Sequence, residues 1–344
     1  MESVPGPAEV AGGVWSVPLP FPNPLGFAFG YVVPVPDGVV VVDAGWDSDE
    51  CWDAFRAGLA AAGAGLDDLV GVVITHVHPD HYGLAERIRA SSAAWLAVHP
   101  AERPRIAAGE HDRVRAIDDM AEWLRQAGAP ASEFAELRAD EADMRAGISM
   151  VVPEHDLRDG DVVPGTAGAL VAVHTPGHTP GHLCFHDRQR RLLFTGDHIL
   201  PRVTPNISKR PQSDVDPLHD FMLSVTKIRG FGSVSVLPGH EWVFGGLRER
   251  LDTLTTHHEQ RLTEIEAAVA AGAGTVWEVT CAVTWSRPFE QLRGRARRAA
   301  IGETFAHLYR LAVEGRIRWV PDRPDRWLPA SGEQPVANLS QPAS

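Results

Sequence analysis

The residues best suited to chemistry are three histidines and one aspartate that lie within six consecutive positions. They are His76, His78, Asp80 and His81. Residues 72–75, directly before them, form a short apolar run rich in β-branched side chains, which predicts a buried strand. Imidazole and carboxylate groups are the ligands that zinc, iron and manganese accept. A lone histidine here would indicate an ordinary polar loop residue, whereas this pattern predicts a metal site.

Backbone geometry explains how these four side chains can converge. Alternate residues of an extended segment point to the same side, so His76 and His78 are expected to face one way. Pro79 ends the strand, and Asp80 and His81 then fall in a turn or at the start of the following helix. The sequence therefore predicts that all four lie at the mouth of one strand.

The same pattern recurs three times later in the chain, where an apolar segment ends in a candidate ligand. These candidates are His178, Asp197 and His240. Ligands at strand ends along one edge of a sandwich can meet at one place. His182 and His198 compete with them, because His182 either supports a ligand or faces the substrate, and His198 is expected to point away. The other histidines are interpreted as surface or structural: His99, His111, His155, His174, His186, His219, His257, His258 and His307.

Strands and helices alternate through the first part of the chain, which predicts an α/β layered domain. One apolar strand ends at Asp43, which either holds a metal ligand in place or caps a turn. Before it, Phe21 and Phe27 lie in a loop rich in proline and glycine, with Phe29 just after, and these rings either line a pocket or pack in the core.

Residues 101–147 are expected to be helical. Their apolar residues lie at helical spacing, which indicates either a stripe packed on the domain or a lid over the metal site, and the size of the insertion favours the lid.

Composition limits the classes of function. The chain has 344 residues, enough for one large domain or two smaller ones. It has no run of eighteen apolar residues and no evident signal peptide at residues 1–13, so we expect no membrane span and a cytoplasmic location. Residues 1–13 and 329–344 are expected to be disordered. A net charge of −13 opposes general nucleic-acid binding, although residues 285–327 carry a local positive excess.

Seven residues carry a resemblance to the metallo-β-lactamase superfamily of hydrolases: His76, His78, Asp80, His81, His178, Asp197 and His240. The resemblance spans residues 14–246 and implies an αββα sandwich, with two facing sheets, helices outside and the site at one edge. The family pattern distributes the seven residues over two Zn²⁺ ions, with His76, His78 and His178 on the first, Asp80, His81 and His240 on the second, and Asp197 bridging both. Iron and manganese are alternatives. The resemblance also implies that Asp80 steers a proton to the leaving group.

The residue at the position of Asp197 differs between branches of the family that the chain resembles. True β-lactamases often have cysteine where Asp197 stands, or lack the bridging acid. Glyoxalase II-like thioesterases, lactonases and phosphodiesterases have aspartate there. Residues 247–328 are expected to form three helices and a two-stranded wing. This order resembles the winged-helix extension of the β-lactamase-like protein 2 branch, which includes an RNA endonuclease and polyketide-processing thioesterases.

These observations predict a dinuclear metal-dependent hydrolase that uses a metal-bridging hydroxide to cleave a carboxylic thioester, ester or lactone. An acidic main domain and an aromatic N-terminal loop suit a small or carrier-bound acyl substrate. The alternative is a metal-dependent single-strand endoribonuclease, in which the arginines at 293, 295, 297 and 298 would follow the RNA backbone. An arginine cluster on a helix more often forms a solvated face or a homodimer surface. A mononuclear iron dioxygenase would leave the second set of ligands idle.

Overall fold

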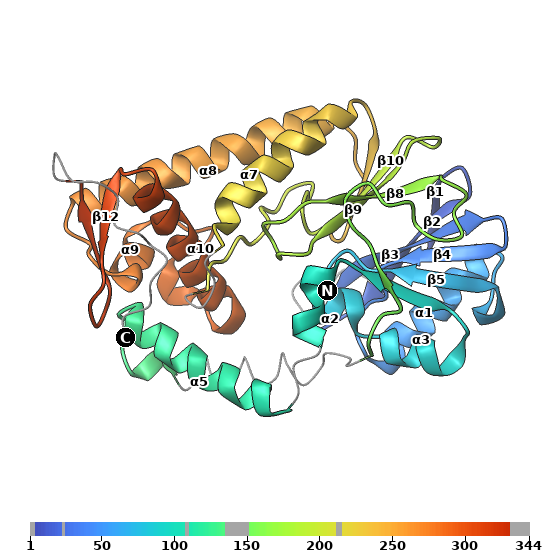
Figure 1. The fold of residues 1–344 in the computed structure, drawn as a ribbon, viewed down its shortest axis with the longest axis horizontal. Coiled ribbons are helices and arrows are strands. Elements are labelled where there is room, and N and C mark those ends of the chain that lie inside the picture. Colours follow the sequence, from blue (N-terminus) through green and yellow to red (C-terminus); the bar gives the residue numbers. More distant parts are fainter. Residues whose placement is uncertain (1–3, 23–24, 107–109, 135–150, 211–214, 331–344) are drawn as a thin grey trace. The chain divides into compact units, whose positions relative to one another are not determined.

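The computed structural model describes residues 4–22, 25–106, 110–134, 151–210 and 215–330 (Figure 1). The chain divides into two compact units. The first comprises residues 1–108, 146–205 and 224–251, and the second comprises residues 109–145, 206–223 and 252–344. The candidate ligands all fall in the first unit. Among the described residues, no helix combines the length and the apolar character needed to cross a membrane.

The first unit contains a seven-stranded sheet whose strands follow one another in sequence order. The strands are β1 (Ala8–Ala11), β2 (Val14–Pro20), β3 (Phe27–Val35), β4 (Gly38–Val42), β5 (Leu69–Val73), β6 (Trp95–Val98) and β7 (His155–Asp156). Pairing is antiparallel from β1 to β4 and parallel from β4 to β7. Parallel neighbours need crossover connections. Helices α1 (Asp49–Ala61), α2 (Pro79–Tyr82) and α3 (Ala85–Ser91) lie in these connections.

A four-stranded sheet in the order β11-β10-β9-β8 completes the first unit. Its strands are β8 (Leu170–His174), β9 (Leu183–Asp187), β10 (Leu192–Gly196) and β11 (Ser235–Pro238). Val40 and Val73 of the first sheet share one buried core with Phe185 and Phe194 of the second. A separate core joins the other face of the first sheet to α1 and α3, which Figure 1 shows along that face. The predicted metallo-β-lactamase sandwich is confirmed.

Two expectations for the N-terminal part are wrong. Residues 1–13 were expected to be disordered, but Ala8–Ala11 form β1. This strand pairs antiparallel with β2, and the Glu9 carboxylate accepts the N–H of Gly13 at the turn between them. Backbone pairing at a sheet edge therefore orders a segment that has little apolar pattern of its own. Phe27, assigned to the loop before the next strand, is instead the first residue of β3 and pairs with Pro20 of β2.

The second unit is mainly helical and ends in a two-stranded sheet. It contains α9 (Val276–Ala282), α10 (Gly294–Val313), β12 (Ile317–Val320) and β13 (Arg326–Pro329). Helices α7 (Pro217–Ile228) and α8 (Leu247–Ala270) contribute residues to both units. The helix and wing order agrees with the predicted order of elements, and the winged-helix assignment stays a prediction. Pro329 belongs to β13 and not to the predicted tail, and residues 331–344 lie outside the described residues.

The insertion at residues 101–147 is shared between the units. The 3₁₀ helix η2 (Pro100–Glu102) and α4 (Arg103–Ile106) belong to the first unit. Helix α5 (Glu110–Gln126) belongs to the second, where Met120, Trp123 and Leu124 share a buried core with residues of α8, α9 and α10. The apolar stripe therefore packs on other helices of its own unit. That the insertion covers the metal site stays a prediction.

Candidate metal centre

The first motif folds as the sequence predicts. Strand β5 ends at Val73, and His76 and His78 follow it, with His78 on extended backbone directly before α2. Helix α2 begins at Pro79, which suits the first helical position because it has no N–H to satisfy. Asp80 and His81 thus lie in the first turn of that helix. His76 and His81 are fully buried.

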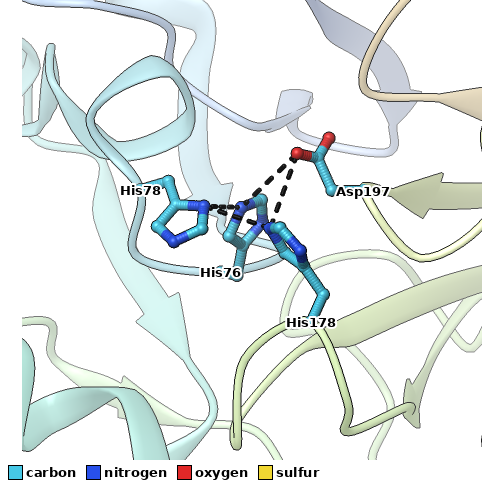
Figure 2. A group of neighbouring side chains, drawn as sticks. All are labelled: His76, His78, His178 and Asp197. Carbon is cyan, nitrogen blue, oxygen red and sulfur yellow. Dashed lines mark hydrogen bonds and ion pairs between the residues drawn. The ribbon is translucent and has the colours of Figure 1, made fainter. Parts of the chain in front are cut away.

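Three imidazoles and one carboxylate form the first of two candidate metal groups: His76, His78, His178 and Asp197. The Nδ1 of His78 lies 2.8 Å from Nε2 of His76 and 3.1 Å from Nε2 of His178. Figure 2 shows the three rings turned toward one another and toward the Asp197 carboxylate. The Oδ2 of Asp197 lies 4.0 Å from Nε2 of His76 and 3.6 Å from Nε2 of His178. A tetrahedral zinc site with bonds of about 2.1 Å needs donors about 3.4 Å apart, so these four atoms fit one divalent cation.

The second group consists of Asp80, His81 and His240. The Nε2 of His240 lies 3.4 Å from Oδ2 of Asp80 and 3.3 Å from Oδ1 of Asp197. The Nε2 of His81 lies 3.9 Å from Oδ2 of Asp80 and 3.4 Å from Oδ1 of Asp197. The Asp197 carboxylate therefore presents one oxygen to each group. The structure brings all seven predicted ligands together.

Hydrogen bonds to the far nitrogens fix how two of these rings present their donor atoms. The Nδ1–H of His81 donates to Oδ2 of Asp43 over 2.8 Å, and the Nδ1–H of His240 donates to the carbonyl of Phe27 over 3.2 Å. Both Nε2 atoms then face the group, where each can bind a cation once its proton is displaced. Asp43 also accepts the N–H and hydroxyl of Thr75, so it both supports a candidate ligand and closes the turn. The sequence left open which of these two roles Asp43 has.

Buried atoms in the second group lack ordinary partners. The Nε2 of His81 and Oδ1 of Asp197 have almost no solvent exposure and no hydrogen-bond partner among the described residues. Native structures rarely leave such atoms unsatisfied. A divalent cation would satisfy both, since it accepts an imidazole lone pair and a carboxylate oxygen. The residues present therefore fit a metal.

The histidines of the two groups differ in their protonation at neutral pH. Burial, followed by the neighbouring imidazoles, lowers the pKa of His76 and His78 well below the ordinary value. Burial also opposes a charge on His240, but the carboxylates of Asp197 and Asp80 raise its pKa to about 10. At neutral pH the rings of His76 and His78 are therefore unprotonated and ready to bind a cation, whereas a cation must displace a proton from His240 in the second group.

We expect metal uptake by the second group to weaken as pH falls. Because the pKa of His240 is raised, this residue keeps its proton below pH 10 in the metal-free protein. Each displaced proton lowers the affinity about tenfold per pH unit below that pKa. Zinc titrations of metal-free protein at pH 6 and pH 8 should differ about 100-fold or more for the second ion and much less for the first. An equal pH dependence for both ions would contradict the proton assignment.

The competing histidines lie beside the groups and belong to neither. The ring of His182 stacks on that of His76 with centroids 5.2 Å apart, and its Nδ1 lies 2.9 Å from the hydroxyl of Thr175. His198 is fully buried, with its ring 5.8 Å from that of His182. His182 thus supports the ring of a candidate ligand, in line with one of its two predicted roles.

An aromatic rim lies next to the second group. The ring centroid of Phe21 is 5.6 Å from that of His240 and 6.5 Å from that of Trp46. Trp242, two residues after His240, is 47% exposed, and the Arg202 guanidinium lies 5.6 Å above its ring. Phe21 was singled out from the sequence, whereas Trp46 and Trp242 were not. Trp46 is marked by its ring contact with Phe21, and Trp242 by its position two residues after His240.

Comparison with known proteins agrees with this geometry. Residues 24–266 match the family model described as the metallo-beta-lactamase superfamily. The chain belongs to this superfamily, and its fold and site define a metallo-β-lactamase-fold hydrolase.

The chain is 33% identical over 230 residues to "Acyl-coenzyme A thioesterase MBLAC2" of Gallus gallus, a match that covers 64% of this chain and 73% of that protein. It is 32% identical over 111 residues to "Beta-lactamase-like protein 2 homolog" of Caenorhabditis elegans, covering 32% of this chain and 35% of that one. A solved metallo-beta-lactamase family protein from Thermus thermophilus superposes with a TM-score of 0.75 at 27% identity, covering 92% of this chain and 98% of that one. The relatives are consistent with the predicted branch.

Proposed function

We propose that the protein is a dinuclear metal-dependent thioesterase that hydrolyses a small or carrier-bound acyl thioester, with esters and lactones as related substrates. The observation that carries this proposal is the Asp197 carboxylate, which has one oxygen toward each of the two groups of ligands. The Gallus gallus relative, named as an acyl-coenzyme A thioesterase, supports the choice of a thioester. We take zinc as the metal for the tests below, with iron and manganese as alternatives.

Two bound cations would supply Lewis acidity and lower the pKa of a water held between them. The residues of the chain hold the groups apart and orient them. Asp197 places negative charge where two cations repel, and Asp43 keeps the donor nitrogen of His81 facing inward. Asp80 is 17% exposed and reaches the second group, so it is the carboxylate that we assign to carry a proton to the leaving group.

Surface chemistry around the second group supports an acyl substrate. Phe21, which contacts the His240 ring, and Trp46, which contacts Phe21, give this side of the site an apolar surface. Binding sites for acyl chains are lined mainly by apolar and aromatic side chains, with a few polar groups that orient the reacting bond. Arg202, the cation that lies over the ring of Trp242, is itself paired with the carboxylate of Glu241.

Two of the four arginines that motivated the RNA alternative bind groups within the second unit. Arg297 is 8% exposed, and its Nη1 lies 2.5 Å from Oε2 of Glu133. Its Nη2 also donates to the carbonyls of Phe289 and Glu290. Arg293 donates to the carbonyl of Leu292. Side chains that stabilise their own fold are poorly placed to follow a phosphate backbone, so we prefer the thioesterase.

A substrate panel tests this proposal. Zinc-loaded protein would be given an acyl-coenzyme A, a short acyl thioester, a lactone, a phosphodiester and a short single-stranded RNA. We expect turnover of the thioesters, with metal-free protein as the inactive control. Cleavage of RNA without acyl turnover would contradict the proposal and support the endoribonuclease.

A further inference from the structure

A buried carboxylate outside the candidate ligands lies between two loops of the first unit. Glu102, the last residue of η2, is fully buried. Its Oε2 accepts the backbone N–H of Val77 over 2.9 Å, and its Oε1 accepts that of Gly181 over 2.8 Å. Among the described residues, no lysine, arginine or histidine forms an ion pair with Glu102. Within the described part of the chain, the hydrogen-bond donors to this carboxylate are therefore two peptide N–H groups.

Both peptide groups belong to segments that carry candidate ligands. Val77 stands between His76 and His78, and Gly181 stands three residues after His178. One side chain thus connects the two stretches of backbone that supply all three imidazoles of the first group. A shift of either loop would alter the distances between the three donor nitrogens.

The surrounding structure makes room for this contact. A Cβ atom on Gly181 would lie 2.7 Å from Cγ and 2.8 Å from Oε1 of Glu102, so only glycine allows the carboxylate to approach this closely. A second contact holds the same loop. The ring of His99, which precedes η2, stacks on that of His174 with centroids 4.0 Å apart. The Nε2–H of His174 donates to the carbonyl of Pro180, next to Gly181.

The chemistry of the contact indicates more than packing. Burial of an ionised carboxylate is costly unless it is well paired, and carboxylates are rarely fully buried without a partner charge. A carboxylate can accept one N–H on each oxygen, which an amide or a hydroxyl cannot do in this geometry. Hydrogen bonds to a charged acceptor are also shorter and stronger than neutral ones. Glu102 is therefore suited to fixing two backbone segments at a set separation.

We propose that Glu102 is a positioning residue that sets the spacing of the three imidazoles in the first group. The inference rests on the metal site of the proposed function. Residues that orient metal ligands typically contribute 10- to 100-fold to metal affinity. Glu102 does so through the backbone of both loops and touches no ligand side chain.

The test is Glu102→Gln, which keeps the size of the side chain but turns one acceptor into a donor. We expect zinc affinity of the first group, measured by competition with a chromophoric chelator, to fall about 10- to 100-fold. The visible spectrum of the cobalt-loaded protein should also change, because the geometry of the three nitrogens changes. Glu154→Gln is a control, since its Oε2 also accepts a backbone N–H, that of Leu96 over 2.8 Å, while the side chain is more exposed, pairs with Arg89 and is bonded to neither loop.

A structural role alone would lower the melting temperature of the metal-free protein and leave zinc affinity and the cobalt spectrum unchanged, and this result would overturn the proposal. Gly181→Ala provides a second variant, because the added Cβ displaces the carboxylate without removing it. A wild-type cobalt spectrum in Gly181→Ala would also overturn the proposal. Failure of the wild-type protein to bind metal would refute the proposed function itself, which keeps the two failures distinct.

Discussion

Asp197→Ala is expected to lose at least one metal ion and nearly all hydrolysis. The Oδ2 of Asp197 lies 3.6 Å from Nε2 of His178, and its Oδ1 lies 3.3 Å from Nε2 of His240. Two unit charges 4 Å apart repel by about 4 kcal/mol at an effective dielectric constant of 20, and two dications repel about four times more strongly. Without the intervening carboxylate this repulsion is no longer offset. We expect the catalytic efficiency kcat/KM to fall on the order of 10³-fold or more.

Metal content and thioester turnover, measured on the same samples, check this result. Asp187→Ala is the control, because Asp187 is also a fully buried aspartate of the first unit. It lies at the end of β9, and its carboxylate binds the backbone and guanidinium of Arg190. Its loss should reduce the melting temperature and leave metal content intact. Two metals and a normal rate in Asp197→Ala would refute the bridging role.

The second large effect is expected from His178→Ala compared with His182→Ala. The Nε2 of His178 lies 3.1 Å from Nδ1 of His78 and within the first group. His182 is only four residues away, but its Nδ1 faces the hydroxyl of Thr175 and it belongs to neither group. We expect His178→Ala to weaken metal binding at the first group more than about 100-fold. His182→Ala should stay within the 10- to 100-fold range typical of residues that support a ligand.

Competition titrations with a chelator of known affinity measure both variants directly. Apparent zinc affinities and the number of ions bound per chain are the quantities to compare. If His182→Ala lost the metal and His178→Ala kept it, the two assignments would have to be exchanged. The pair therefore decides a question that the sequence left open.

The candidate ligands could be found from the sequence because each lies next to a local signal. An apolar run, a break in the run and a histidine or aspartate at its end are visible without any knowledge of distant contacts. The convergence of His76, Asp197 and His240 then follows from packing two sheets so that their strand ends share an edge. The same logic placed Asp43 at a strand end, where it binds His81.

Contacts between distant segments could not be predicted in this way. Glu102 is bonded to residues 25 and 79 positions away, and nothing in its own neighbourhood indicates burial. Strand β1 has a single large apolar side chain, Val10, and is ordered by pairing with β2. The stripe on α5 was correctly seen as amphipathic, but its partners in α9 and α10 follow it by more than 130 residues. Local periodicity identifies an apolar face and does not identify what covers it.

The measurement that tests the central claim most directly is anomalous X-ray diffraction from crystals of the zinc-loaded protein, recorded at the zinc absorption edge. Two anomalous peaks are expected, one among His76, His78 and His178 and the other among Asp80, His81 and His240. The carboxylate of Asp197 should contact both. A single peak, or a peak away from these residues, would contradict a dinuclear centre built on Asp197.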